Sequence, residues 1–563
     1  MWFDFKRTCL SIVIILTLNH TVNASKLIVK NQSDFDRLAV AIKELLNSGS
    51  NVDVFIRKGV YYFSDEQLLL KDIHKPGLSV KISGKSAVLV SMPVEYRRIT
   101  PYNATINGHQ DVNIWSDIYN SPEKVSIVDI NKKLCRLKRN DNLEVKEGGY
   151  LLLTKWYTSG LYMIEKIEND YIYFSAPNTR YREKYGEYDV NFDYVYNKTY
   201  PRYKLLITNT FSDEYNVCSS SSFFVTQNCQ FSKVEISGLT FIGGSGEGAV
   251  VKFKELKAYV VKMTNCIFSA LRNKAVAAEA TNNVTIDRCI FTDCYSTVVT
   301  TDEDCSNLTV KNNVWVKCGQ LLDNPSCVVV SGMNYLIKDN TFEDFYGRAL
   351  TLGVYFSKGN SVKSSGMVEN NEFYFTPSFL ESAPYNLLMD NGAIYVNTLN
   401  DNLEIRNNYI HDFAGAGDNR GIFLDDGAIN VKITGNVIAN IAHGFAISAR
   451  RVKSVESTVG LSNVGNSIQG NIIEGRIRFE GNELSNNGCE YGENYLLVKS
   501  NSEVLKNTLK NVNLVGEDIF VTYTGYEKGK ICIENNSYMQ MRKSPVWKNL
   551  KNRIVLSRNQ KVQ

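Results

Sequence analysis

The sequence predicts an all-β solenoid, in which short parallel strands coil and stack on one another. Two observations predict it. A short phrase recurs, with Asn or Cys two positions before a bulky apolar residue, and Val, Ile and Thr alternate with polar residues before that Asn or Cys. The copies are VEISGLTF (234–241), VKMTNCIF (261–268), VTIDRCIF (284–291), LTVKNNVW (308–315), LIKDNTF (336–342), MVENNEF (367–373), LEIRNNYI (403–410), VKITGNVI (431–438), IRFEGNEL (477–484) and EVLKNTL (503–509).

The spacing of the copies fits one turn of a coil per copy. Their closing residues lie 27, 23, 24, 27, 31, 37, 28, 46 and 25 positions apart. This unit is too short for a blade of four strands, and its apolar residues alternate instead of recurring three and four apart as in a helix. Turns that stack at about 4.8 Å would give a rod roughly 45 Å long for ten turns.

The Asn or Cys of each copy predicts a ladder inside the coil. Stacked amides hydrogen-bond to the turns above and below, so we interpret these residues as structural. The predicted ladder is Cys266, Cys289, Asn313, Asn340, Asn371, Asn408, Asn436, Asn482 and Asn507.

With these motifs the chain resembles the right-handed parallel β-helix proteins of the pectate-lyase-like superfamily, over about residues 50–100 and 230–535. Stretches such as NLTVKNNVWVKCG (307–319) and NLEIRNNYIHDF (402–413) carry the resemblance. It implies a right-handed parallel β-helix of about ten or more coils. Because this scaffold hosts lyases, hydrolases, esterases and non-catalytic adhesins, the resemblance does not select an activity.

The first residues predict export. Residues 1–24 have a charged start, an apolar run of about ten residues and a small-residue pattern before Ser25, which is typical of a secretory signal. The run is too short to span a bilayer, and no later stretch reaches the roughly 18 apolar residues that a membrane helix needs. We therefore expect a secreted or periplasmic protein without a membrane span.

The next segment, 25–100, is expected to hold an N-terminal cap and the first coils. Ser33 could cap an amphipathic helix that runs to about Leu46. This helix would cover the open end of the first coil and hide its strand edge. The residues expected on its apolar face are Phe35, Leu38, Ala39, Ile42 and Leu45.

Between residues 101 and 228 the repeat disappears and tyrosine becomes frequent, which predicts a β-rich insertion packed against the coil. Aromatic side chains can stack on the apolar faces of sugar rings, so Trp156, Tyr157 and Tyr162 are candidate substrate-binding residues. The alternative is that they form the core of a small β-subdomain. The coil itself is expected over 229–540, followed by a basic tail at 541–563.

The cysteines favour buried thiols. Of the 12 cysteines, Cys9 lies in the predicted signal, and the remaining 11 show no C-x-x-C spacing typical of zinc sites. Export permits disulfides, but a core of this size does not need them.

Charge gives little information about partners. The chain has a formal net charge of +4, of which the tail contributes +7 and the predicted signal +1, so residues 25–541 carry about −4. This balance does not by itself argue for an acidic ligand, and the tail contains Trp547 and several aliphatic residues, unlike a nucleic-acid-binding arm. We expect a monomer that binds no nucleic acid.

Segment 411–453 is the predicted site of chemistry, because its polar residues exceed what coiling requires. Asp425 and Asp426 end a strand, and side chains alternate along a strand, so one should face a groove and the other a corner. The candidate catalytic residues are His411, Arg420, Asp425, Asp426, His443, Arg450 and Lys453, and the candidate substrate-binding residues are Asn397, Asn419 and Arg451.

Glycines suggest how these turns align. If Gly392, Gly421 and Gly444 begin equivalent strands, Asn397 stacks beside Asp426 and Arg450 lies on the next turn. Neighbouring turns would then bring these residues within about 5 to 10 Å. The alternative is that the two aspartates cap turns and pair with arginines in solvated salt bridges.

Two enzymatic interpretations compete for this groove. A polysaccharide lyase removes the C5 proton of a uronate while a cation neutralises its carboxylate. Arg420, Arg450 and Arg451 could neutralise, and Lys453, His411 or His443 could take the proton. Asp425 or Asp426 would orient the base or hold Ca²⁺, the one cofactor that we consider.

A glycoside hydrolase instead needs two facing carboxyl groups, and Asp425 or Asp426 would need a partner such as Asp390, Asp412 or Asp418 from another turn. The excess of cations favours elimination. The resemblance then suggests an acidic polysaccharide as substrate, namely a glycosaminoglycan such as chondroitin sulfate or hyaluronan, or a related uronan. A third interpretation is a non-catalytic glycan-binding β-helix, although the long loops on one side favour an enzyme.

Overall fold

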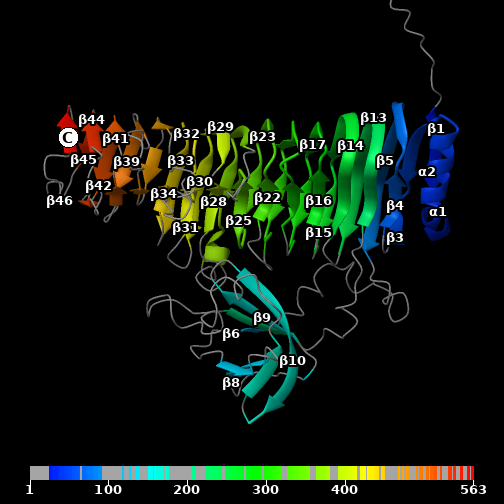
Figure 1. Ribbon diagram of the computed structural model, residues 1–563, viewed down its shortest axis with the longest axis horizontal. Coiled ribbons are helices and arrows are strands. Elements are labelled where there is room, and N and C mark those ends of the chain that lie inside the picture. Colours follow the sequence, from blue (N-terminus) through cyan, green and yellow to red (C-terminus); the bar gives the residue numbers. More distant parts are fainter. Residues whose placement is uncertain are drawn as a thin grey trace, which may run out of the picture.

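The computed structural model describes residues 24–63, 66–91, 222–243, 248–271, 274–294, 297–319, 326–354, 363–380, 391–397, 399–414, 419–425, 428–442 and 445–449. It also describes separate strands between residues 117 and 208 and between 467 and 562. Within these residues, 39 strands form one continuous sheet, whose neighbours pair in parallel along an elongated coil (Figure 1). The all-β coil predicted from the repeat is confirmed.

Each turn of the coil contributes a strand to three faces. The first face precedes the Asn or Cys of the repeat in the copies from 234–241 to 431–438. It contains β1 (Ala24–Val29), β2 (Asn51–Ile56), β5 (His74–Ser91), β13 (Ser222–Ile242), β14 (Ala249–Thr264), β17 (Val284–Asp287), β20 (Thr309–Lys311), β23 (Tyr335–Lys338), β26 (Ser364–Glu369), β29 (Asn400–Arg406), β32 (Val431–Thr434), β35 (Ser467–Gln469), β38 (Glu490–Tyr491), β41 (Thr508–Lys510), β44 (Ile531–Glu534) and β47 (Ile554–Ser557).

The second face follows the Asn or Cys. It contains β3 (Gly59–Phe63), β15 (Ile267–Ser269), β18 (Ile290–Thr292), β21 (Val314–Val316), β24 (Thr341–Glu343), β27 (Glu372–Tyr374), β30 (Tyr409–Ala414), β33 (Val437–Ala442), β36 (Ile472–Glu474), β39 (Asn494–Val498), β42 (Val512–Gly516), β45 (Ser537–Met539) and β48 (Gln560–Val562). The long strands β5, β13 and β14 run through more than one face.

The third face completes the turn. It contains β4 (Glu66–Lys71), β16 (Lys274–Glu279), β19 (Val299–Thr301), β22 (Ser326–Val330), β25 (Arg348–Leu352), β28 (Asn391–Val396), β31 (Asn419–Leu424), β34 (Phe445–Ala449), β37 (Ile477–Glu480) and β40 (Glu503–Leu505). Near the end of the chain, β43 (Phe520–Thr522) and β46 (Val546–Lys548) pair in parallel with each other.

The bulky residues that close the repeats form a column inside the second face. Phe241, Phe268, Phe291, Trp315, Phe342 and Phe373 stack in order, with ring centroids 4.5 to 5.1 Å apart. Ile410 and Ile438 continue the column in the next turns. No single turn could bury these side chains alone, so the apolar column stabilises the coil as a stack.

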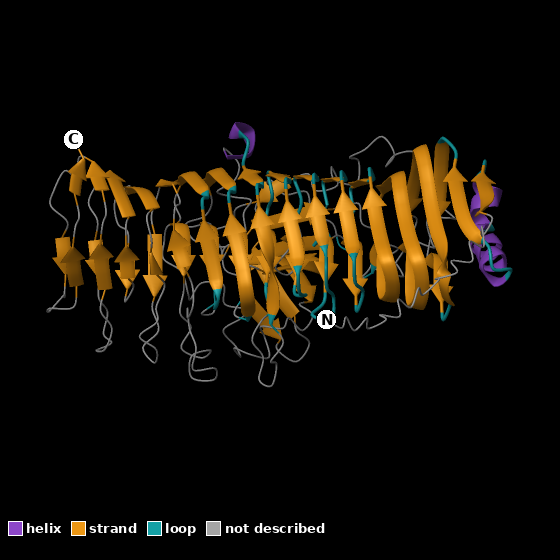
Figure 2. Cartoon of the chain, turned by 90° about the horizontal axis from the view of Figure 1, so that it is seen from above, coloured by secondary structure: helices purple, strands orange, loops and turns teal. Residues whose placement is uncertain are grey.

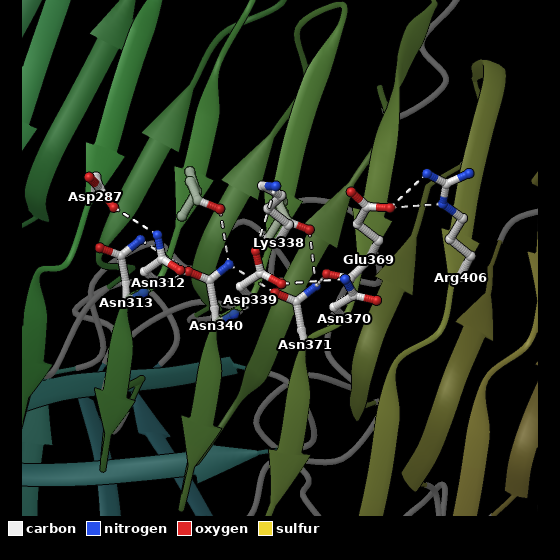
Figure 3. Close-up of polar contacts among 12 residues, drawn as sticks. Asp287, Asn312, Asn313, Lys338, Asp339, Asn340, Glu369, Asn370, Asn371 and Arg406 are labelled. Atoms are coloured by element: carbon white, nitrogen blue, oxygen red, sulfur yellow. Dashed lines mark hydrogen bonds and ion pairs between the residues drawn. The ribbon is translucent and has the colours of Figure 1, made fainter.

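The predicted amide ladder is present from Cys289 to Asn436. Figure 3 shows its middle part, Asn313, Asn340 and Asn371. Asn340, for example, donates from its backbone N and Nδ2 to Oδ1 of Asn371, at 3.1 and 2.8 Å. The residue before each ladder position adopts a positive φ, which explains why Asn and Asp recur there. Asn482 and Asn507 lie outside the described residues. The last two predicted copies were out of phase, because their strands, β37 and β40, pair along the third face and not the first.

Two short helices cover the first coil, at the opposite end from the C-terminus (Figure 2). They are α1 (Gln32–Asp36) and α2 (Leu38–Asn47), so the predicted single helix is divided at Arg37. The predicted cap was wrong: Asn31 precedes α1, and its side chain accepts a hydrogen bond from the backbone N of Asp34. Phe35, Leu38, Ile42 and Leu46 are buried, and the predicted face residues Ala39 and Leu45 are partly buried and pack against the core.

A separate seven-stranded sheet lies below the middle of the coil in Figure 1. Its neighbouring strands pair antiparallel. They are β6 (Asp117–Tyr119), β7 (Ser126–Asp129), β8 (Leu134–Lys138), β9 (Tyr150–Lys155), β10 (Thr158–Glu168), β11 (Tyr171–Ser175) and β12 (Lys204–Thr208). These strands fall within the segment where the repeat disappears from the sequence.

Cysteines inside the coil are free thiols, as predicted. Seven are described and all are buried: Cys229, Cys266, Cys289, Cys294, Cys305, Cys318 and Cys327. Burial raises the pKa of the Cys305 thiol to about 12. Among the residues that the structure describes, no helix is both long and apolar enough to cross a bilayer.

Candidate functional site

The outward side of the third face is buried where β28, β31 and β34 run side by side. Inward positions on these strands hold Ile394, Ile422 and Ile447, which stack in register and fill the core. Outward positions alternate with them and would normally meet solvent. Instead Tyr395 is 5% exposed, and Phe423 and Ser448 are 0% exposed. This part of the surface is therefore enclosed and has a lower effective dielectric than an open strand face.

Tyr395 connects three neighbouring turns. Its hydroxyl donates to Oδ2 of Asp425 at 2.5 Å. The guanidinium carbon of Arg348, on β25, lies 3.3 Å from the centroid of the Tyr395 ring. Because a cation over an aromatic face is attracted more strongly when both are desolvated, this contact is worth about 2 kcal/mol. The cation–π contact with Arg348 and the hydrogen bond to Asp425 thus fix the orientation of the Tyr395 phenol.

A second guanidinium lies over Phe423, the aromatic ring that packs against Tyr395. Arg420, 1% exposed, stacks its guanidinium carbon 3.7 Å from the centroid of Phe423. The ring of Phe423 meets the ring of Tyr395 edge to face, with centroids 5.1 Å apart and planes at 89°. We call Arg348, Tyr395, Arg420, Phe423 and Asp425 the arginine–tyrosine cluster. It combines two positive charges, one phenol and one carboxylate.

The alignment of turns by glycine was wrong. Gly392 pairs with Arg420 and not with Gly421, and Arg420 pairs with Phe445. The glycines meet different needs, since a Cβ on Gly421 would lie 2.5 Å from the Ala446 carbonyl oxygen, whereas one on Gly392 would find no contact closer than 3.4 Å. The register follows the buried isoleucines instead.

In the observed register Leu424 pairs with Val396. Asp425, and not Asp426, therefore takes the position beside Asn397. The backbone N of Asp425 donates to the Val396 carbonyl at 3.0 Å. Asn397 is partly buried at the adjacent turn, and its Nδ2 donates to the Gly353 carbonyl at 3.4 Å. Asn397 therefore supports the turn between the third and first faces.

His411 lies on the second face and forms a cluster of its own. Its ring stacks on Tyr409 at 4.0 Å and on Tyr374 at 5.3 Å between centroids. Nδ1 is 2.8 Å from Oδ2 of Asp412, and Nε2 is 3.2 Å from Oε1 of Glu372. The hydrogen bond with His411 holds the pKa of the Asp412 carboxyl below its usual value. The structure thus separates His411 from Arg420 and Asp425, with which the sequence grouped it.

Several predicted site residues lie outside what the structure describes. They are Trp156, Tyr157, Asp426, His443, Arg450, Arg451 and Lys453, and the side chains of Tyr162, on β10, and Asn419, on β31. Arg420 and Asp425 are the candidates that the structure brings together, through Phe423 and Tyr395.

The Ca²⁺ site considered from the sequence includes Asp426, which lies outside the described residues, so it stays a prediction. Ca²⁺ takes six to eight oxygen ligands. Asp425 accepts the Tyr395 hydroxyl, whose ring carries the Arg348 guanidinium. Among the described residues no group of three or more His, Cys, Asp and Glu side chains could hold a metal.

Sequence reasoning missed Arg348 and Tyr395. A signal was available, because Arg348 and Tyr395 occur in otherwise apolar strands, RALTL and NGAIYV. Alignment by isoleucine instead of glycine would have placed Tyr395 beside Phe423, which is their observed register.

Comparisons with known proteins agree with the coil. Residues 208–374 match the family model described as a right-handed β-helix region. The strand pairing and this match together identify a right-handed parallel β-helix. No curated protein matches the chain.

Similar solved structures include a glycoside hydrolase with a TM-score of 0.40 and 8% identity, covering 95% of this chain and 96% of its own. A surface adhesin of Streptococcus pneumoniae has a TM-score of 0.36 and 12% identity, covering 92% and 90%. The A-module of a mannuronan C-5 epimerase of Azotobacter vinelandii has a TM-score of 0.35 and 11% identity, covering 91% and 96%. Similarities this distant do not indicate an activity.

Proposed function

We propose that this protein is a secreted or periplasmic polysaccharide lyase, which cleaves a uronic-acid-containing polysaccharide by β-elimination at the arginine–tyrosine cluster. The observation that carries the proposal is one buried guanidinium over the ring of a phenol that is hydrogen-bonded to a carboxylate, with a second buried guanidinium over the neighbouring ring of Phe423. Elimination needs a cation to neutralise the uronate carboxylate and a group that moves a proton. The cluster offers both.

Burial strengthens these electrostatic effects. The charge that develops on a uronate when its C5 proton leaves is stabilised far more by a guanidinium in an enclosed site than in water. Arg348 is 5% exposed and Arg420 1% exposed, so both guanidinium groups lie in such surroundings. Because the cluster is buried, the substrate must gain access to it before elimination can occur.

Hydrolysis is less well supported. A hydrolase needs a second carboxyl group within about 5 to 10 Å of the first, on the other side of the scissile bond. Asp412, one of the partners considered for Asp425, lies on the second face and accepts hydrogen bonds from His411 and Asn440. Asp390, Asp418 and Asp426 lie outside the described residues.

The test is incubation of the purified protein with hyaluronan, chondroitin sulfate, alginate and pectins. Elimination creates a double bond conjugated to the uronate carboxylate, which absorbs in the ultraviolet. New reducing ends without that absorbance would show that the protein is a hydrolase and not a lyase. No product in either assay would favour a glycan-binding protein.

Site-directed variants test the location. Arg348→Met removes the charge over Tyr395 but keeps the apolar stem, and we expect kcat/KM to fall about 100- to 1,000-fold. Arg406→Met is the matched control, because Arg406 pairs with Glu369 on the first face at 2.7 Å. Equal activity in both variants would move the site away from the cluster.

A further inference from the structure

We infer that Tyr395 carries the proton in both halves of the elimination, and that the enzyme therefore acts on uronates whose C5 hydrogen and C4 oxygen lie on the same face of the sugar ring. The inference rests on the proposed function and adds the substrate's stereochemistry to it. Its basis is the set of side chains on the described third face that can carry a proton.

The outward side of β25, β28, β31 and β34 presents Thr351, Tyr395, Phe423 and Ser448 in register. Of these, Tyr395 is the group that lies against a guanidinium and also bonds to a carboxylate. The imidazole of His411 is on the second face, between Tyr374 and Tyr409. Within the described part of the chain, Tyr395 is thus a phenol placed to exchange protons beside Arg348, and its neighbour Phe423 carries Arg420.

The contacts of Tyr395 suit a group that cycles between phenol and phenolate. Arg348 sits over the ring at 3.3 Å and stabilises negative charge on it by Coulomb attraction. Asp425 Oδ2 accepts the hydroxyl proton at 2.5 Å and can hold it when the phenolate forms. The rings of Phe423 and Tyr395 pack edge to face, and this contact restricts the rotation of the Tyr395 ring.

The step balances without an oxidant or a cofactor. The Tyr395 phenolate takes the proton from C5, the C4–C5 double bond forms, and the C4–O bond breaks with its electron pair on the leaving oxygen. The Tyr395 hydroxyl then gives the same proton to that oxygen, and the phenolate is regenerated. The products are one unsaturated uronate end and one free hydroxyl.

One side chain that performs both transfers must approach one face of the ring, so the elimination is syn. In glucuronate and mannuronate the C5 hydrogen and the C4 oxygen lie on the same face. In galacturonate, iduronate and guluronate they lie on opposite faces, and elimination would need a base and an acid on either side. The inferred substrates are therefore polymers of glucuronate or mannuronate.

Ser448 offers a further contact for such a polymer. Its side chain is 0% exposed and outward, in register with Phe423, and its Oγ makes no hydrogen bond with the described residues. A buried hydroxyl without a partner costs about 1 to 3 kcal/mol, which a sugar hydroxyl would recover. Loss of this contact should raise KM more than it lowers kcat.

The experiment compares substrates of known configuration by ultraviolet absorbance. We expect product from hyaluronan or polymannuronate, and none from polyguluronate, polygalacturonate or dermatan regions rich in iduronate. Product from the second set would overturn the single-tyrosine mechanism but leave the lyase intact. No product from any polymer would overturn the proposed function itself.

The matched variants are Tyr395→Phe and Tyr335→Phe. Tyr335 is also buried, at 2% exposed, but lies on the first face, so it controls for the loss of a buried phenol hydroxyl. We expect Tyr395→Phe to lower kcat about 100- to 10,000-fold with little change in KM, and Tyr335→Phe to leave kcat unchanged. A Tyr395→Phe protein that is folded by circular dichroism and retains kcat within about tenfold would refute the role of Tyr395.

Discussion

Replacing Asn371 with alanine tests whether the amide ladder stabilises the coil. The Asn371 side chain is central to four neighbours: Nδ2 donates to Asn408 Oδ1 at 2.9 Å and to the Ile337 and Glu369 carbonyls at 3.0 Å. Its Oδ1 accepts from both nitrogens of Asn340, at 3.1 and 2.8 Å. The residue is 1% exposed, so water cannot replace these contacts freely.

The expected loss follows from the groups left without partners. Each buried donor or acceptor without a hydrogen bond costs about 1 to 3 kcal/mol, and at least two groups, on Asn340 and Asn408, lose a bond to the Asn371 side chain. A water molecule in the vacated space would recover part of this. We therefore expect Asn371→Ala to lower the free energy of unfolding by about 3 to 5 kcal/mol.

Urea unfolding monitored by far-ultraviolet circular dichroism measures this loss. The control is Asn370→Gly, because Asn370 is exposed at φ 55 and glycine accepts that backbone conformation. Its Nδ2 makes one long contact with Asp339, at 3.4 Å, so we expect less than about 1 kcal/mol. An Asn371→Ala protein no less stable than Asn370→Gly would show that the ladder does not stabilise the coil.

Three further predictions concern the core, the thiols and pH. Phe342→Ala opens a cavity between Trp315 and Phe373 and should cost about 3 to 5 kcal/mol in the same unfolding assay; a loss below about 1 kcal/mol would contradict the stacked column. The Cys305 thiol should resist labelling by a disulfide reagent until urea unfolds the coil, because burial raises its pKa to about 12; rapid labelling of the native protein would be inconsistent with this burial. Asp412 has a lowered pKa, so its stabilising effect is present at neutral pH and is lost as pH falls below the usual value of 3.8. The difference in thermal midpoint between the native protein and Asp412→Asn should therefore shrink between pH 7 and pH 3, and a constant difference would disprove the coupling to His411.

The sequence predicted the scaffold well because a stacked coil repeats one local solution many times. The positions of Asn313, Asn340 and Asn371 were readable since each turn needs an amide that bonds to its neighbours on both sides. The bulky residue two positions later was equally readable as a column. Ten imperfect copies average out the irregularities of any one turn.

The prediction of local details failed where two residues were equally suited to one structural role. Asn31 and Ser33 are both suitable caps, and only the path of the chain from β1 decides that Asn31 accepts the Asp34 amide. Glycines likewise misled the alignment, because a glycine can mark a close approach of backbones, as at Gly421, without marking the start of a strand.

The candidate site was hardest to predict because its outward positions look like core. Phe423, Ala446 and Ser448 lie on the side of the third face that would normally be solvated, yet they are 0% exposed. A sequence with apolar residues on both sides of a strand indicates burial but not what is enclosed. The arginines break this pattern, because arginine is rarely buried and Arg348 and Arg420 are each buried against an aromatic ring. If these contacts were only structural, replacing Arg348 and Tyr395 together by Met and Phe could change the stability of the fold but should leave the lyase activity of the folded protein unchanged. If the cluster is the active site, the same double variant should remain folded while its lyase activity is lost, and measurement of both properties on one protein separates the two roles.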